Sequence, residues 1–228
     1  MGSTSVRIAD LILSEAGWNK SMSSKKIYET ENYDRVFKGV DFSDSQIQDI
    51  KFNNCEFIDC EFSEATLNGS RFVDCLFKGC NLSLIKIRGA SFANTTFEES
   101  KVIGVNWTEA SWPTIELVSP IHFFRSVLDN SIFFGINLRE IRITKSSAVG
   151  VDFRECNLTK ADFSHTDFAQ ALFMNTNLFQ ANFVESTNYA IDISNNNVGK
   201  ASFSLPDAVA LLKGIDICVV DEAGNDIL

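Results

Sequence analysis

The feature that constrains this chain most is a large apolar residue at every fifth position. Starting at Phe37, each fifth residue through Leu117 is large and apolar, which makes 17 consecutive positions without an exception. The frame then slips by one residue, resumes at Phe123 and runs to Phe203, with Asn188 as its one polar position. A period of five matches neither an amphipathic helix nor a flat strand. It predicts a chain that turns a corner every five residues and stacks its coils around one continuous interior.

A second column, made of small or β-branched residues, lies two positions before each large residue. Val40, Ala65, Ala90 and Ser131 are examples. The slot between the two columns often holds Asp or Asn, whose short side chains bond the backbone at turns. The chain has 20 Phe against three Tyr and three Trp. This bias follows from the pattern, because one niche repeated along the chain selects one side-chain shape.

This pattern resembles the pentapeptide repeat family, whose consensus unit is Ala-(Asp/Asn)-Leu-x-x. The units 161–165, 171–175 and 181–185 carry the resemblance most clearly, and it extends over residues 35–205. It implies an all-β fold, a right-handed quadrilateral β-helix (a pentapeptide repeat solenoid) with four units per coil. Two frames of 17 units would make about 8.5 coils and, at ~4.8 Å per coil, a rod of roughly 40 Å.

The repeat divides the chain into three parts. Residues 1–21 carry no repeat and are either a leader segment or a native N-terminal helix. Residues 22–205 form the expected solenoid, and residues 206–228 form an expected C-terminal capping helix, strand and tail. The frame slip at 118–122 predicts a bulge of one extra residue. Such a bulge is too short for the longer projecting loops of some Qnr proteins.

The C-terminal part predicts a cap for the last coil. Ser204 is the expected N-cap of a helix over 206–213, followed by a largely buried strand over 215–220. Resemblance to the Qnr-type and microcin-immunity members of the family implies that this segment also joins two subunits head to head. The expected homodimer contacts are its apolar residues Leu211, Leu212, Ile217 and Val219.

No set of residues predicts catalysis. His122 and His165 are the only histidines, which are too few for a multi-histidine metal site. A ladder of regularly spaced Asp differs from the single tuned pair of acid–base chemistry. We expect no enzyme activity, no cofactor and no metal. Buried free thiols fit a cytoplasmic protein, and five of the six cysteines lie in the small column: Cys55, Cys60, Cys75, Cys80 and Cys156.

The charge balance points to a basic partner. The chain has 20 basic and 30 acidic residues, a net charge of −10, which disfavours nucleic acid and anionic membranes as partners. Basic residues are interspersed among the acids, and no single coil face is purely acidic. The expected partner-binding surface consists of outward acids: Asp44, Asp49, Asp59, Glu64, Asp74, Glu98, Glu99 and Glu109. A second contact patch is expected from outward apolar residues: Phe124, Phe134, Met174 and Phe179.

Two functions follow from these features. The resemblance to Qnr-type and immunity proteins implies a DNA mimic that binds a type II topoisomerase, DNA gyrase or topoisomerase IV, and protects it from a quinolone or a peptide toxin. Carboxylates would then stand in for phosphates. The alternative is a scaffold or protein-interaction module with no topoisomerase role. The net acidity favours the first hypothesis, and the outward Phe residues favour the second.

Overall fold

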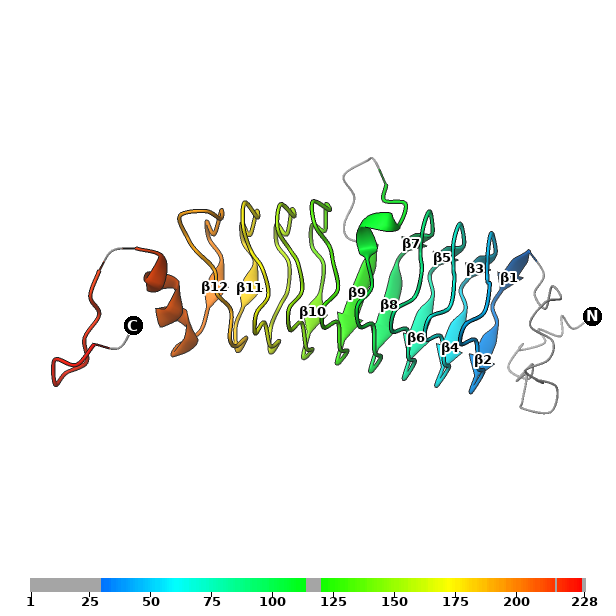
Figure 1. The fold of residues 1–228 in the computed structure, drawn as a ribbon, viewed down its shortest axis with the longest axis horizontal. Helices are drawn as coiled ribbons and strands as arrows, with labels where there is room; N and C mark the ends of the chain where they lie inside the picture. The colour runs from blue at the N-terminus through cyan, green and yellow to red at the C-terminus, as the bar shows by residue number, and fades with distance from the viewer. Residues whose placement is uncertain (1–29, 114–119, 216, 227–228) are drawn as a thin grey trace, which may run out of the picture.

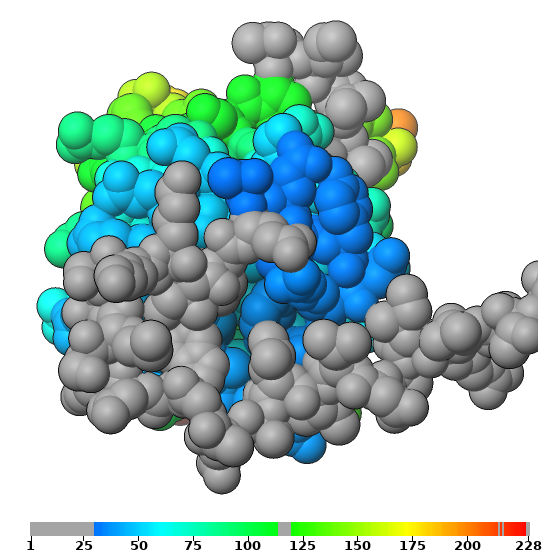
Figure 2. Space-filling view, turned by 90° about the vertical axis from the view of Figure 1, so that its right-hand side faces the viewer, coloured from blue at the N-terminus to red at the C-terminus, as the bar shows by residue number. Residues whose placement is uncertain are grey.

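The computed structural model describes residues 30–113, 120–215 and 217–226, which form one rod of stacked coils (Figure 1). Seen from the N-terminal end, the first coils lie in front of the later ones (Figure 2). Each coil has four sides, and each side pairs in parallel with the side twenty residues further on, as Glu31 does with Lys51 and Asp41 with Glu61. The predicted quadrilateral β-helix is therefore confirmed.

Two of the four sides contain strands. Side 1 begins as the sheet β1-β3-β5-β7, and side 2 as the sheet β10-β9-β8-β6-β4-β2. The strands of side 1 are β1 (Glu31–Tyr33), β3 (Lys51–Asn53), β5 (Arg71–Val73) and β7 (Ser91–Ala93). Those of side 2 are β2 (Val36–Lys38), β4 (Glu56–Ile58), β6 (Leu76–Lys78), β8 (Thr95–Glu98), β9 (Ile121–Phe124) and β10 (Ile143–Thr144), continued by β11 (Asn182–Phe183) and β12 (Ser202–Phe203).

The other two sides are held by single bridges. Side 3 begins with Asp41 and Glu61, and side 4 with Gln46 and Thr66. In the second half, side 1 continues through the bridged residues Asn137, Asn157, Asn177 and Asn197.

The large column fills the interior. From Phe37 to Trp107 every member is at most 7% exposed, and from Phe123 to Phe183 at most 6%. Rings on the same side stack face to face, as Phe52 does on Phe72 at 5.1 Å. Rings on adjacent sides meet edge to face, as Phe52 and Phe57 do at 5.3 Å. Both arrangements suit aromatic pairs, so the Phe bias has a direct structural cause.

The small column does more than fill space, because its polar members bond the coil before them. Ser70 Oγ donates to Ile47 O at 2.8 Å, and Cys156 Sγ donates to Phe133 O at 3.0 Å. In both cases the acceptor lies 23 residues back in the chain. Thr and Ser donate in the same way elsewhere. These cysteines were expected to act only as small apolar groups, and all six thiols are free.

The middle column closes the corners, as predicted. Asp162 Oδ1 accepts from the backbone N of Ser164 at 3.1 Å, and Asn177 Oδ1 accepts from that of Phe179 at 3.2 Å. The residue after each such bond adopts a positive φ, for example His165 at 58°. Asp and Asn thus serve as turn formers, which explains their regular spacing without any catalytic role.

The frame slip is not a one-residue bulge. Lys101 pairs with Asn81, twenty residues back, but with Val127, 26 residues ahead. Because Ser111 still bonds Ala90 O in the coil below, the six extra residues leave the stack between Ser111 and Ile121. A whole unit plus one residue is therefore left out of the stack, shortly after the 3₁₀ helix η2 (Trp107–Glu109).

Two members of the predicted large column are affected by this loop. Trp112 is partly buried beside the core, and its indole N–H donates to Trp107 O at 2.8 Å. Leu117 lies outside the described residues.

At a second irregularity in the repeat, the interior position expected for Asn188 is occupied by the next residue, Tyr189. Asn188 is exposed with φ 59°, and Tyr189 is 4% exposed with its ring 5.6 Å from Phe183 and 5.4 Å from Phe203. A buried amide without partners would cost more than a local change of backbone, so the aromatic residue takes the interior place.

The C-terminal end is capped by the 3₁₀ helix η3 (Asp207–Gly214), whose Leu211 packs on the core. Ser204 is not its N-cap, because Ser204 Oγ instead accepts from the backbone N of Glu185 at 2.8 Å. The expected buried strand over 215–220 is also wrong. Ile217 and Val220 are 49% and 54% exposed, and the pairing described there is one antiparallel bridge between Val220 and Asp226.

Candidate functional site

The structure concentrates acid on side 3 of the first two coils. Asp41 bridges Glu61, and Asp44 and Glu64 occupy the corners that follow them, with φ of 57° each. We call these four residues the acidic strip. Asp44 and Glu64 were expected, whereas Asp41 was assigned only a turn role and Glu61 was not singled out. Among the described residues, side 3 with its corners carries one base, Lys101, against six acids: Asp41, Asp44, Glu61, Glu64, Asp129 and Asp167.

Neutral partners orient the acidic strip. Glu61 accepts from the backbone N of Ser63 at 2.9 Å and from Asn81 Nδ2 at 3.1 Å. Asp41 Oδ1 accepts from the backbone N of Ser43 at 2.9 Å. Hydrogen bonds of this kind hold the Glu61 carboxylate in place, and Asp41, Asp44 and Glu64 are exposed to solvent.

The other predicted acids are dispersed over different corners. Asp49 and Glu109 follow side 4, Asp59 follows side 2 and Asp74 follows side 1. Two predicted acids are paired with bases. Glu98 contacts Lys78 at 3.0 Å, and Glu99 contacts Arg125 at 3.3 Å. The eight residues are therefore not one surface.

Side 2 carries bases on the two coils that follow the frame slip. Arg125 lies on the first of them, and Arg142 and Lys145 lie on the second. Beside them is an open hollow of about 500 Å³ lined by His122, Glu140, Arg142, Lys160 and Asp162. Charge along the rod is thus unequal, with acid on side 3 of the first two coils and base on side 2 of the two coils after the frame slip.

His122 is part of this basic region but is held neutral. Its Nδ1 accepts from the backbone N of Arg142 at 3.2 Å. Burial, together with the nearby Arg142 charge, lowers the pKa of His122 to about 4. The other histidine, His165, contacts Glu185 at 2.8 Å. The two histidines therefore have separate surroundings.

The predicted apolar patch is split over three sides. Phe134 and Met174 lie on side 4, whereas Phe124 lies on side 2 under Arg125, and Phe179 lies on side 1 under Lys200. Side 4 adds Ile132 and Leu172, which occupy middle-column slots that usually hold Asp or Asn. We call the side 4 group the apolar patch; its members are 39% to 46% exposed: Ile132, Phe134, Leu172 and Met174.

An ion pair lies between the two halves of the apolar patch. Arg154 Nη2 contacts Asp152 Oδ2 at 2.8 Å, and its guanidinium lies 5.6 Å from the Phe134 ring centroid. The hydrogen bond from Arg154 lowers the pKa of Asp152. The sequence signal for this patch was an apolar residue, Ile132 or Leu172, at a middle-column position where Asp or Asn usually stands.

The expected dimer residues are also divided. Leu211 packs on the core, Leu212 and Val219 are partly buried, and Ile217 is exposed. Leu205, which was not predicted, is 79% exposed at the same end. The apolar surface there therefore comes mainly from residues flanking η3.

Within the described ranges, no group of three or more His, Cys, Asp and Glu residues is placed to hold a metal ion. No helix in the same ranges is long and apolar enough to cross a membrane.

Comparison with known proteins agrees with the coil geometry. A family model described as a pentapeptide repeat region matches residues 50–120, and a second, pentapeptide repeats in eight copies, matches residues 136–175 and 156–187. The chain is similar to a quinolone resistance pentapeptide repeat protein, QnrB96 of Scandinavium goeteborgense, at 30% identity over 109 residues. That match covers 43% of this chain and 51% of the relative, so the chain spans about half the length of the curated relative it matches.

Solved structures show the same fold. A trypsin-treated variant of QnrB1, a plasmid-mediated fluoroquinolone resistance protein, is similar with a TM-score of 0.56 and 19% identity, over 84% of this chain and 92% of that one. Full-length QnrB1 is similar with a TM-score of 0.50 and 16% identity, over 82% and 100%.

Proposed function

Because the chain belongs to the pentapeptide repeat family and its sequence is similar to a Qnr protein, we propose that it binds a type II topoisomerase, DNA gyrase or topoisomerase IV, and protects it from a poison. The protein would act by occupancy rather than catalysis, in the cytoplasm, with neither nucleic acid nor membrane as a partner.

The acidic strip is the observation that carries this proposal. Asp41, Asp44, Glu61 and Glu64 repeat along one side at the strand spacing of ~4.8 Å, and they face solvent on a side with a single described base. A DNA-binding groove of a topoisomerase is basic, and complementary charge raises the rate of encounter. The strip would therefore enter that groove in place of phosphates.

Dimerisation would extend the rod. We propose that two copies meet end to end at the C-terminal cap, through Ile217 and Val219 together with the exposed Leu205 and Val220. Leu211 and Leu212 of η3 would lie beneath this contact, because Leu211 already packs on the core.

The test compares two variants, each of which loses four carboxylate charges. The strip variant is Asp41→Asn, Asp44→Asn, Glu61→Gln and Glu64→Gln. Its matched control, with the same change in net charge at scattered corners, is Asp59→Asn, Asp74→Asn, Glu109→Gln and Glu155→Gln. Gyrase binding and supercoiling in the presence of a quinolone would be measured for both.

We expect the strip variant to lose at least about tenfold in gyrase affinity and to lose protection, with the control close to wild type. Wild-type affinity should also fall as salt rises, because exposed charges are screened over ~8 Å at physiological ionic strength. Equal losses in both variants would show that net charge matters and the strip does not. No binding at micromolar concentration in low salt would reject the proposal.

The second candidate function is a protein-interaction module that uses the apolar patch. The observation in its favour is that Ile132, Phe134, Leu172 and Met174 gather on one side of the rod. A surface of this kind is typical of contact sites. Gyrase binding that ignored salt and was lost on Phe134→Ser would assign recognition to the patch and reject mimicry of phosphate charge.

A further inference from the structure

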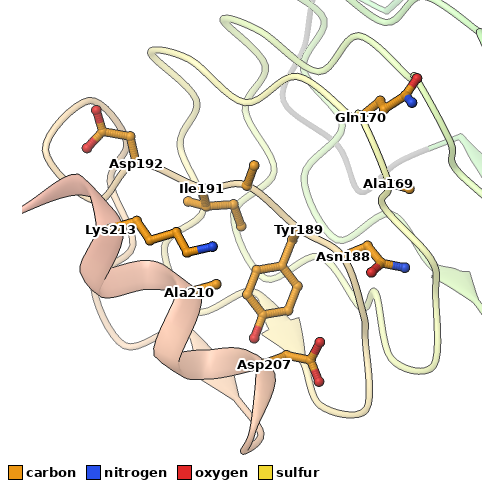
Figure 3. A pocket seen from close by; sticks show the side chains of 10 residues that line it. Ala169, Gln170, Asn188, Tyr189, Ile191, Asp192, Asp207, Ala210 and Lys213 are labelled. Atoms are coloured by element: carbon orange, nitrogen blue, oxygen red, sulfur yellow. The ribbon is translucent and has the colours of Figure 1, made fainter. Parts of the chain in front are cut away.

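A second hollow lies where η3 meets the last coils (Figure 3). Its volume is about 660 Å³, within the range of small-molecule sites. A 3₁₀ helix has three residues per turn, so every third side chain of η3 falls on the same face. That face and the coil opposite line the hollow with six main residues: Asp207, Ala210 and Lys213 from η3, and Tyr189, Ile191 and Asp192 from the coil.

The hydroxyl of Tyr189 marks this hollow as more than a gap in the packing. The ring packs at a tilt against both Phe183 and Phe203, and the residue is 4% exposed. Its hydroxyl oxygen is buried, has no hydrogen-bond partner and lies at the hollow on the side of Asp207 (Figure 3). A Phe would supply the same packing without an unmade bond. The hydroxyl is therefore the group that a ligand would satisfy.

The charges around the hydroxyl select a cation. Asp192 and Asp207 outnumber the one ammonium, Lys213. Asp192 already accepts from the backbone N of Ser194 at 2.8 Å, which leaves Asp207 as the carboxylate available to a ligand. Burial and the Asp207 charge raise the pKa of Tyr189 to about 12. The hydroxyl thus stays neutral and can accept a hydrogen bond from a ligand.

The remaining walls are apolar. Ile191, Ala169 and the ring of Tyr189 face the space from the coil, and Ala210 faces it from the middle of η3. Because Ala210 carries only a methyl group, the space between the two charged ends of the helix face stays open. A ligand with an apolar body would bury that body here.

We propose that this hollow binds a small organic cation, an amine on a short apolar body, whose N–H groups bond Tyr189 Oη and the Asp207 carboxylate. The apolar body would lie against Ile191 and Ala210. This site is independent of the topoisomerase role, because the acidic strip belongs to the first two coils and the hollow to the last.

Three probes with one shape and different charge test the proposal. Phenethylamine is the cation, 2-phenylethanol is its neutral analogue and phenylacetate is the anion. Calorimetry and protein NMR would measure the binding of each to the full chain. We expect saturable binding of phenethylamine, at least about tenfold stronger than that of 2-phenylethanol, and none of phenylacetate. Shifted amide signals should centre on Tyr189 and η3.

Three variants separate the groups involved. Asp207→Asn should weaken phenethylamine binding at least about tenfold, and Tyr189→Phe should weaken it while keeping the ring stack. Ala210→Leu should abolish binding by filling the space. Asp162→Asn, in the other hollow, is the matched control and should bind as wild type does. Thermal unfolding of each variant checks that the rod is intact.

The proposal fails if the three probes bind equally, if none binds at millimolar concentration, or if the folded Asp207→Asn and Ala210→Leu variants bind as wild type does. It also fails if Asp162→Asn alone abolishes binding, because the cation would then occupy the hollow beside His122.

Discussion

Phe57 and Phe77 stack face to face with their ring centroids 4.6 Å apart and their planes 8° from parallel, although twenty residues separate them in the chain. The same relationship continues from Phe77 to Phe97 at 5.1 Å and from Phe97 to Phe123 at 5.0 Å. The last step spans 26 residues rather than twenty. The aromatic stack is therefore continuous through the looped-out unit, and it joins the two halves of the rod into one core.

Truncating one ring of this stack should destabilise the whole rod. Phe77→Ala removes a fully buried ring, and we expect it to lower the free energy of unfolding by about 3–5 kcal/mol. Denaturant unfolding measures the change. Phe134→Ala, which truncates a ring that is 40% exposed, is the control and should cost less than about 1 kcal/mol. Equal costs would show that the stack is not the main source of stability.

A glycine corner should tolerate a side chain least where another side chain lies directly beneath it. Gly79 and Gly39 have nearly the same φ, 64° and 62°, but a Cβ on Gly79 would lie 2.5 Å from Asp59 Oδ1 and one on Gly39 would meet nothing within 4 Å. Gly39→Ala should cost about 1–2 kcal/mol from backbone strain alone, and Gly79→Ala should cost more by the free energy needed to turn the Asp59 carboxylate aside.

Adding Asp59→Ala to Gly79→Ala should recover the difference, because it removes the clashing carboxylate. If Gly79→Ala and Gly39→Ala unfold at the same denaturant concentration, the close approach of Asp59 is not a constraint.

One thiol of six should react quickly in the folded protein. Cys218 is exposed, whereas Cys55, Cys60, Cys75, Cys80 and Cys156 are buried. Burial raises the pKa of the Cys156 thiol to about 12, so it stays in its unreactive protonated form. Titration with a chromogenic disulfide reagent should find one fast thiol in the native state and six after unfolding. Cys218→Ser should remove the fast phase, and a fast phase that survived it would contradict the burial of the column.

His122 should make the folded state less stable in mild acid. Its pKa is lowered to about 4 in the fold and is about 6.5 in an unfolded chain. The unfolded state therefore binds a proton more readily, and the contribution of neutral His122 is complete above pH ~6.5 and declines as pH falls towards ~4. The free energy of unfolding should fall less steeply over this range in His122→Gln, and identical slopes would exclude this linkage.

NMR gives a direct check of the same group. The ring-proton shift of His122, assigned by its absence in His122→Gln, should show no titration above pH ~5.5 in the native protein.

Most of the interior could be predicted from the repeat. Residues such as Phe72, Leu128 and Phe163 are buried as expected, because each occupies an equivalent niche in a stack. The role of Asp162 and its equivalents as turn formers was also predictable, since a corner every five residues requires a side chain that bonds the backbone. The burial of Tyr189 was not predicted, because the five-residue period assigns the interior position to Asn188.

The candidate site was predicted less well. Asp44 and Glu64 were identified as outward acids, but their grouping with Asp41 and Glu61 depends on which units share a side. The apolar patch was similarly incomplete, because Ile132 and Leu172 occupy a slot that turn-forming residues usually fill.

The sequence by itself determined that this chain is a stack of five-residue units, which residues face the interior, and that acids outnumber bases along the rod. Only the tertiary structure decided which units lie above one another in the second half. A one-residue insertion and a six-residue loop give the same sequence pattern, because six residues are one five-residue unit plus one. In both cases the large column resumes at Phe123. The packing of Phe97 on Phe123 selects the loop, and this turns every later residue by one side of the rod.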